Sequence, residues 1–204
     1  MDNKKINVIA ISGVDGVGKS TLATLLSKQL RANILPFADG LRRDILKYYP
    51  HLDPEEIYRK PTPRKIRNLL RSHSLERTQK DDLFWVKKWD NEWNRKLVIV
   101  DDVRFMREIL HLEQLGCYHI HIYTPESTYY TFKDIPSFRE IPRLKRRADY
   151  MFYTRYYSAI DMSHKVLEQV EPLVAWQKEE TKKRQLKRYQ QVKLNRERDL
   201  MLMG

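Results

Sequence analysis

Glycine is scarce in this sequence, with only six residues among 204. Half of these six fall within one short segment, at Gly13, Gly16 and Gly18. Glycine adopts backbone conformations that other residues avoid, and it costs conformational entropy where that freedom is not needed. A chain that uses so little glycine and clusters half of it therefore needs an unusual backbone path at residues 13–18.

Cysteine is almost absent as well, and no long apolar run is present. The single Cys117 cannot form an intramolecular disulfide bond, which excludes a secreted disulfide scaffold and indicates a reducing, cytoplasmic setting. Because Cys117 begins the alternating apolar segment 117–123, we expect a buried structural thiol. No window contains the roughly 18 apolar residues of a membrane helix, and residues 6–11 are too few for a signal peptide. We therefore expect a protein without membrane contact.

Short apolar runs alternate with helical patterns along most of the chain. The runs cover residues 6–11, 33–37, 97–100, 117–123 and 150–153. Helices are expected at about residues 19–31, 40–48, 63–73, 81–94, 104–115 and 158–170. Continuous β-branched runs that alternate with helices are typical of a parallel sheet covered on both faces. We predict an α/β fold of three layers around a central five-stranded parallel sheet.

Two basic segments depart from this pattern. Residues 125–147 contain three prolines and a dense group of cations, and they are too polar for a core element, so we interpret them as a mobile insertion. Residues 178–198 contain nine Lys and Arg against three acids and no glycine or proline, which favours an exposed helix. This helix supplies six of the twelve surplus positive charges. We therefore divide the chain into a domain of residues 1–175 and a basic helical tail of residues 176–204.

The glycine cluster fits the phosphate-binding motif G-x-x-x-x-G-K-[ST] without a mismatch. The segment consists of Gly13, Val14, Asp15, Gly16, Val17, Gly18, Lys19 and Ser20, followed by Thr21. Glycines let successive backbone N–H groups point at phosphate oxygens, and the start of the next helix adds a partial positive charge. In such a loop Lys19 reaches the β- and γ-phosphates and the Ser20 hydroxyl ligates Mg²⁺. The motif predicts that the chain binds ATP with Mg²⁺.

A carboxylate is expected beside this loop to hold the water shell of the metal. Asp101 directly follows the apolar run 97–100, which places it at the carboxyl end of a strand, where ligands bind in such sheets. Asp102 could exchange roles with Asp101. No N-K-x-D sequence for reading guanine is present, which argues against a GTPase.

The sequence resembles the nucleoside monophosphate kinases, and four of its segments resemble the phage-type deoxynucleoside monophosphate kinases among them. The similar segments are residues 13–21, 37–42, 67–87 and 101–108. The first of these segments would also suit a thymidylate kinase. The chain departs from the family pattern at Gly40, which replaces a proline, and at residues 72–74, which replace a turn that contains glycine. The resemblance covers about residues 6–170.

The resemblance implies transfer of the γ-phosphoryl group of ATP to a (deoxy)nucleoside 5′-monophosphate. It implies an acceptor-binding helical region at about residues 40–95 and a short lid at about residues 125–147. Residues implied for the acceptor are Asp15, Phe37, Asp39, Arg42, Arg67, Arg77, Trp85 and Arg104. The residues implied for catalysis are Lys19, Arg104 and the lid arginines Arg139 and Arg143. Arg146 and Arg147 belong to the same lid. The metal would be held by Ser20 and Asp101. Adenine would lie near residues 153–155.

Several of these assignments have structural alternatives. Any one of the acceptor arginines could instead form a surface salt bridge. Asp15 could cap the loop rather than approach the acceptor sugar, and Asp39 could cap the following helix. The Trp85, Trp89 and Trp93 stripe is expected in the core, with Trp85 the residue that matches the family. His119 and His121 share one strand face without a third metal ligand.

Two other functional hypotheses concern the net charge and the tail. A net charge of +12 favours contact with polyanions, so the chain could be a 5′-polynucleotide kinase or a DNA-stimulated ATPase. The tail could instead bind a partner protein through Leu186, Tyr189 and Val192. A homodimer is also possible.

Overall fold

A parallel five-stranded sheet forms the centre of the molecule. The computed structural model describes residues 5–59, 62–124 and 136–202, with side chains up to residue 191 except residue 189. The strands are β1 (Val8–Ser12), β2 (Asn33–Ile34), β3 (Val98–Val103), β4 (Cys117–Tyr123) and β5 (Tyr150–Tyr153). They pair in parallel in the order β2-β3-β1-β4-β5, with Val8 opposite both Val98 and Cys117. The predicted sheet is confirmed.

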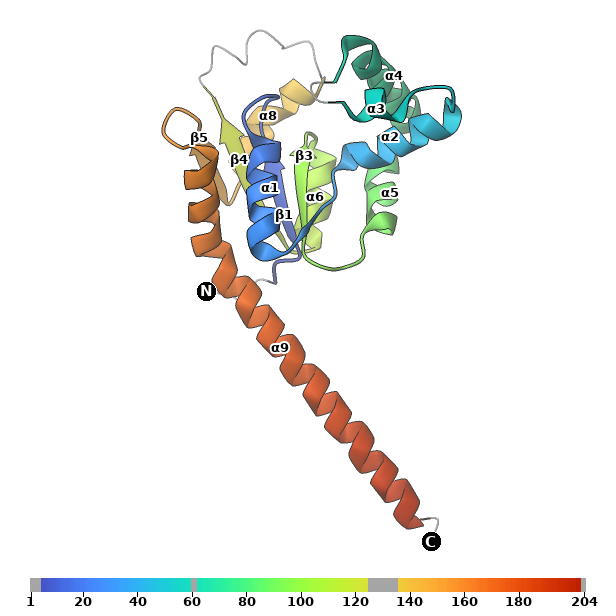
Figure 1. Ribbon diagram of the computed structural model, residues 1–204, viewed down its shortest axis with the longest axis vertical. Coiled ribbons are helices and arrows are strands. Elements are labelled where there is room, and N and C mark those ends of the chain that lie inside the picture. The colour runs from blue at the N-terminus through green and yellow to red at the C-terminus, as the bar shows by residue number, and fades with distance from the viewer. Residues whose placement is uncertain (1–4, 60–61, 125–135, 203–204) are drawn as a thin grey trace.

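Helices cover both faces of this sheet and complete the three predicted layers (Figure 1). Helices α1 (Lys19–Leu30) and α9 (Ala159–Leu202) pack on the face that carries Ile9 and Ile11. Helices α5 (Phe84–Glu92), α6 (Met106–Gln114) and α8 (Pro136–Arg147) lie toward the opposite face, which carries Val8 and Ala10. Apolar residues on both faces of one strand explain why β1 is buried along its whole length.

A helical region stands beside the carboxyl edge of the sheet, on the β3 side (Figure 1). It consists of α2 (Phe37–Tyr48), α3 (Pro54–Tyr58) and α4 (Arg64–Lys80), which pack with α5. Ile45, Ile57 and Ile66 give this region a small apolar core of its own. The region corresponds to the acceptor-binding segment that the sequence predicted at about residues 40–95.

Helix α2 begins earlier than predicted. Phe37 was expected to end a strand, but it is the first residue of α2, and Pro36 precedes it in an extended conformation. The backbone N–H groups of Phe37 and Ala38 donate to the Asp102 carboxylate at 2.9 and 2.8 Å. A carboxylate 65 residues away thus caps this helix, and a local pattern could not show it. The cap expected of Asp39 is wrong, because Asp39 lies inside the first turn.

Helix α8 corrects the prediction of a mobile polar insertion at residues 136–147. The segment is a helix in which Ile141 and Leu144 are buried while its cations remain outside. These two residues lie three positions apart, on one face of the helix, and pack into the two main apolar cores. Two well-placed apolar residues were enough to anchor a segment of very polar composition. The other part of the predicted insertion, residues 125–135, lies outside the described residues.

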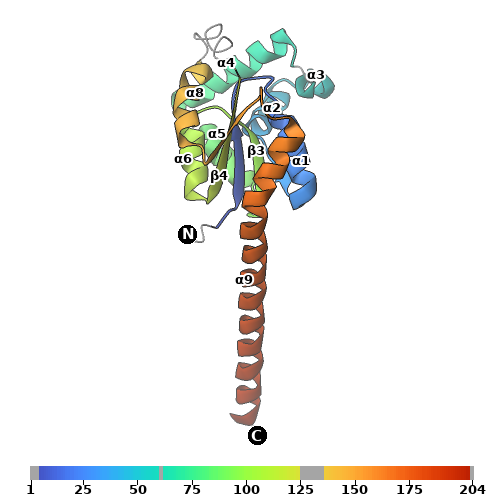
Figure 2. The same cartoon turned by 90° about the vertical axis from the view of Figure 1, so that its left-hand side faces the viewer.

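The tail is a direct continuation of the last domain helix. Helix α9 runs without interruption for 44 residues, and its buried apolar residues among the described side chains are Met162, Val166, Leu167, Val170 and Val174. Beyond them the helix leaves the domain as a single rod (Figures 1 and 2). The helix predicted at residues 178–198 is present, and its residues from 181 to 188 are exposed. No helix in the described part of the chain is both long and apolar enough to span a bilayer.

Two further expectations about the core are confirmed. Cys117 is a buried thiol. The tryptophan stripe is buried, with the Trp89 and Trp93 rings stacked at a centroid distance of 5.6 Å. Trp89 Nε1 donates to the Leu35 carbonyl at 2.8 Å, so its polar atom is satisfied as well.

Candidate functional site: the phosphate loop and its two sides

The glycine cluster forms a loop between β1 and α1 with the backbone that the motif requires. Gly13, Gly16 and Gly18 have φ values of 139°, 85° and 92°, which side chains rarely permit. At Gly13 a Cβ atom would also collide with the carbonyl oxygen of Ile122. Gly18 is the N-cap of α1, so the loop ends on the free N–H groups of a helix start. This arrangement suits an anion above the loop.

Lys19 lies folded into the loop. Its Nζ atom donates to the carbonyls of Gly13 and Val14 at 2.9 and 2.7 Å and lies 3.9 Å from the Asp15 carboxylate. Burial, together with the charge of Arg104, lowers the pKa of this amine to about 8, against the opposite effects of Asp15 and Asp101. The amine is thus held by weak neutral acceptors, which a phosphate could replace.

A cavity of about 420 Å³ opens on one side of the loop, where α9 begins. It is lined by Val14, Asp15, Gly16, Val17, Gly18, Thr21, Thr124, Thr154, Tyr157, Ala159 and Met162. The predicted loop residues and Thr154 therefore meet in one place. Thr124, Tyr157 and Met162 were not predicted. Thr124 could have been found because it directly follows the apolar run 117–123 and so lies at the same sheet edge as the loop.

A narrower recess lies on the other side of the loop, under the start of α8. Its lining includes Asp15, Val103, Arg104, Ser137 and Phe138. Arg104 donates from Nη2 to Asp15 Oδ1 at 2.8 Å. Burial raises the pKa of Asp15, but Arg104, Lys19 and Arg67 together lower it below its usual value. The structure therefore brings the predicted residues Asp15, Arg104 and Arg67 into one charged group.

The two neighbouring aspartates have different surroundings. Asp102 is occupied by the α2 backbone, and burial together with the charge of Asp101 raises its pKa to about 6. The buried Asp101 makes no side-chain hydrogen bond with any residue that the structure describes, and its charge acts on Lys19. Asp101 is consequently the carboxylate that can serve a cation beside the loop, and the exchange of roles with Asp102 is not needed.

Glu108 holds the backbone that carries Arg104. Its buried carboxylate accepts from the N–H groups of Arg104 and Phe105 at 2.7 and 3.0 Å. Burial and the charge of Asp102 raise its pKa to about 7, against the lowering effect of these two hydrogen bonds. Glu108 belonged to the segment 101–108 that resembles the kinases, but no role was predicted for it.

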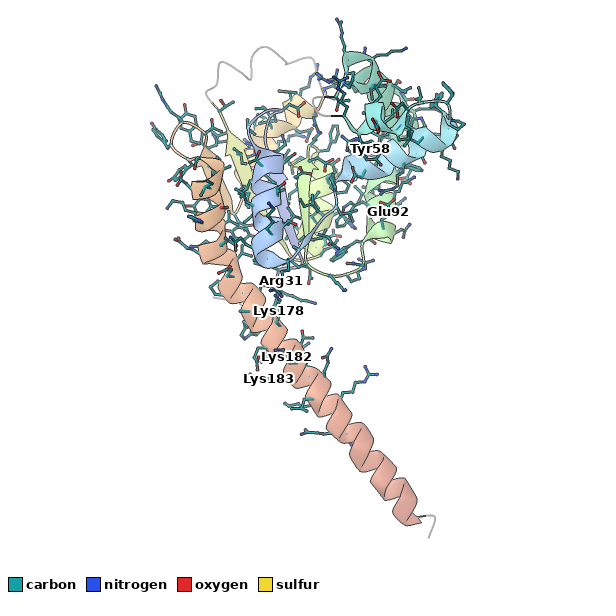
Figure 3. All side chains as sticks on the ribbon, viewed as in Figure 1. Arg31, Tyr58, Glu92, Lys178, Lys182 and Lys183 are labelled. Atoms are coloured by element: carbon teal, nitrogen blue, oxygen red, sulfur yellow. The ribbon has the colours of Figure 1, made fainter. Side chains whose placement is uncertain are left out.

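Other predicted acceptor residues have partners within the helical region. Arg42 pairs with Asp39 at 2.9 Å and lies over the ring of Tyr58, which Figure 3 labels. Arg77 lies 3.7 Å from Asp44 and over the ring of Tyr48. Their role as acceptor ligands stays a prediction.

The two predicted aromatic ligands are part of the core. Trp85 is buried, and its Nε1 donates to the Ser74 carbonyl at 3.4 Å. Phe37 is buried against Trp89, with a centroid distance of 5.4 Å.

The lid arginines are spread along α8. Arg147 donates from Nε and Nη2 to Glu113 on α6 at 2.8 and 2.5 Å, which fixes the end of α8 to the domain. Arg143 is largely exposed and lies 3.7 Å from Glu140. Arg139 is exposed as well, in the first turns of α8 beside the recess residue Phe138.

Two histidines support the strand that leads into the loop. The Ser12 hydroxyl lies 2.7 Å from His119 Nε2 and 2.8 Å from His121 Nδ1. Burial lowers the pKa of the two rings to about 4 and about 3, so both are neutral at pH 7. Within the described ranges no cluster of three or more His, Cys, Asp or Glu is arranged for a metal ion.

Comparison with solved structures finds similar arrangements among kinases. The shikimate kinase from Aquifex aeolicus is 17% identical, covers 81% of this chain and 96% of its own, and has a TM-score of 0.44. A gluconokinase from Sinorhizobium meliloti is 12% identical over 84% of this chain and 95% of its own, with a TM-score of 0.47. The dephospho-CoA kinase from Campylobacter jejuni is 13% identical over 84% and 98%, with a TM-score of 0.44.

No family model matches the chain, and no curated protein matches its sequence. At such identities and TM-scores the likeness is one of fold alone. The chemistry of this chain therefore rests on its own residues.

Proposed function

We propose that the protein is an ATP-dependent kinase that phosphorylates a (deoxy)nucleoside 5′-monophosphate. The proposal rests on the position of the phosphate loop between a cavity and a recess. A cavity of about 420 Å³, within the range of small-ligand sites, lies on one side. A recess with a paired arginine and carboxylate lies on the other. A donor and an acceptor could thus meet at the loop.

The cavity suits the donor nucleotide. Its lining by the loop and by Thr154 and Tyr157 offers N–H groups for phosphates and an aromatic ring for a base. On binding, Lys19 would exchange the Gly13 and Val14 carbonyls for phosphate oxygens.

Ser20 and Asp101 fit a magnesium ion, since hydroxyl and carboxylate oxygens at the helix start and strand end are the ligands that this cation prefers. When bound, Mg²⁺ would neutralise charge on the transferring phosphate. Asp101 suits this role because its buried carboxylate makes no side-chain hydrogen bond with the residues that the structure describes.

The paired Arg104 and Asp15 on this other side of the loop suit an anionic acceptor. A monophosphate oxygen is already a nucleophile, so the reaction needs no general base, and alignment and charge neutralisation remain as the main tasks. Arg104 would exchange the Asp15 carboxylate for the acceptor phosphate, with Arg67 nearby. Asp15 would then be released toward the acceptor sugar. Glu108 would keep the Arg104 backbone in place during this exchange.

The test is to incubate the protein with ATP, Mg²⁺ and each deoxy- or ribonucleoside monophosphate, and to follow ADP formation. We expect rapid transfer to at least one monophosphate, and a loss on the order of 10² to 10³-fold or more in Lys19→Ala, because a donor to the transferring phosphate is removed. Lys28→Ala, an exposed position on the same helix, is the matched control. Turnover on a 5′-hydroxyl oligonucleotide with none on any monophosphate would refute the proposal.

A further inference from the structure

The tail segment, residues 178–188, begins where α9 loses contact with the domain. Val174 is the last buried residue among the described side chains of α9, and the Gln177 side chain still lies against the backbone of Ile6. With its amide oriented to satisfy both groups, Gln177 donates to the Ile6 carbonyl at 2.9 Å and accepts from the Ile6 N–H. Every residue from 181 to 188 is exposed. The tail segment is therefore a free helical surface.

The tail segment points away from the phosphate loop. Ala159 and Met162, at the start of α9, line the nucleotide-sized cavity. From there α9 packs along α1 and leaves the domain at the opposite edge of the sheet (Figures 1 and 2). At 1.5 Å per residue, Lys178 lies roughly 28 Å along the helix from Ala159. The cations of the tail segment therefore cannot serve a substrate in the cavity of the same molecule.

The charge of the tail segment is dense and lies on several sides of the helix. Six of its eleven residues are Lys or Arg, against Glu179 and Glu180. The cations form three i,i+4 pairs, 178 with 182, 183 with 187, and 184 with 188, and these pairs point in three directions around the axis. Figure 3 shows Lys178, Lys182 and Lys183 extending from the rod just below the domain. Among described side chains of the tail segment, Lys183 has an ion-pair partner, Glu180 at 3.4 Å.

This distribution discriminates between the partners that a basic helix can have. A helix at a membrane surface needs an apolar face, and Leu186 is the only apolar residue of the tail segment. A second copy of the same helix would bring like charges together. Single-stranded nucleic acid is usually held by stacking on aromatic rings, and residues 178–188 contain none.

A helix in the major groove of duplex DNA has phosphates on both sides, so it needs cations on more than one face. The deep and narrow major groove of duplex RNA does not admit a helix in this way. We propose that the tail segment binds the phosphate backbone of double-stranded DNA, without sequence preference, as a site separate from the phosphate loop.

The test is a titration of a fluorescently labelled duplex of arbitrary sequence with the full chain, followed by fluorescence anisotropy at several salt concentrations. Six cationic contacts predict a slope of about −5 for log K against log salt, and a loss of affinity on the order of 10³-fold between about 50 and 200 mM salt. No turnover enters this measurement, so its outcome is independent of the proposed kinase activity.

Two variants of the full chain have equal net charge and separate the tail segment from the rest. The tail variant carries glutamine, which keeps helix propensity, at Lys182, Lys183, Arg184, Lys187 and Arg188. The control variant carries glutamine at the exposed domain residues Lys28, Lys47, Lys80, Lys87 and Lys96. We expect the tail variant to reduce the salt slope to about −1, and the control variant to retain it. Equal losses in both variants would overturn the proposal.

Charge reversal on single faces tests the groove geometry. The three variants are Lys178→Glu with Lys182→Glu, Lys183→Glu with Lys187→Glu, and Arg184→Glu with Arg188→Glu. Binding within a groove predicts weaker affinity for at least two of the three. An effect confined to one face, or tighter binding of single-stranded DNA, duplex RNA or anionic phospholipid vesicles than of the duplex, would overturn the proposal. Circular dichroism of each variant checks that the helix is retained.

Discussion

The cations at the phosphate loop and the cations of the tail segment lie in different surroundings. At the loop, Lys19 and Arg104 are held by defined partners at 2.7–2.9 Å, and burial together with the charge of Arg104 lowers the Lys19 pKa to about 8. From residue 178 to residue 188 the cations are exposed and face solvent on several sides. Partly buried charge gains strength and geometric precision from low dielectric surroundings, whereas exposed charge acts through its density and is screened by salt. Lysine and arginine thus suit two kinds of recognition. At the loop they suit a single phosphate group, and on the tail segment they suit the repeated phosphates of a nucleic-acid backbone.

Among the cations with defined partners, substitution of Arg104 should have the largest effect on substrate binding. We expect Arg104→Ala to raise the KM for the monophosphate by between roughly tenfold and a hundredfold, since a hydrogen bond to a charged group is worth about 1.5–3 kcal/mol. The KM for ATP should change much less. Steady-state kinetics with either substrate varied provide the measurement.

Arg107→Ala is the matched control for Arg104→Ala. Arg107 pairs with Asp82 at 2.9 Å and lies over the ring of Phe105, outside the residues that line the recess. Equal effects of the two substitutions on the monophosphate KM would contradict the placement of the acceptor beside Arg104.

The pH dependence of nucleotide binding should be intermediate in size. The free Lys19 amine has a pKa of about 8, and phosphate oxygens favour its charged form, so binding raises this pKa. At pH 8 about half of the free molecules carry a neutral amine, and binding should take up about half a proton. Affinity for ATP should therefore fall as the pH rises above 8, by at most about tenfold per pH unit.

Calorimetry of ATP binding in buffers of different ionisation enthalpy measures this uptake. Lys19→Arg remains charged at pH 8 and should show no uptake from this position. If the wild-type protein and Lys19→Arg took up equal amounts, the proton would belong to another group.

The smallest expected effect separates the domain from the tail. A chain that ends after Gln177 should keep the unfolding temperature of the full protein. A chain that ends after Ala175 also loses the Gln177 amide, and a loss of about 1 kcal/mol corresponds to about 2–4 °C in a protein of this size. Differential scanning calorimetry of both chains measures the difference. A large loss for both would mean that the tail contributes to folding, contrary to the division drawn here.

Local sequence patterns predicted the features that depend on neighbouring residues. The motif at residues 13–20 specified the loop because its glycines, Lys19 and Ser20 act through their own backbone and the next helix. The order of apolar runs and helices was enough for a parallel sheet, since such runs have few alternatives. The exposed basic helix was also predictable from composition.

Features that depend on distant contacts were not predictable. Asp101 and Asp102 are adjacent residues of the same type, so the sequence does not distinguish them. They differ because the N–H groups of Phe37 and Ala38 bind the carboxylate of Asp102. The polar composition of α8 did not indicate a packed helix, because the stabilisation that Ile141 and Leu144 provide depends on the strands beneath them. The lining by Tyr157 and Met162 likewise depends on how α9 packs against the loop.

The Asp102 cap also sets a mechanical condition for the helical region. Helix α2 is fixed at its first turn to the end of β3, while its far end lies in a separate small core. A helix of 12 residues is about 18 Å long, so a rotation of about 10° around that fixed turn would displace its far end by about 3 Å. Asp102 therefore restrains the start of α2 beside the end of β3, and any rotation of the helix about that point would move its far end most.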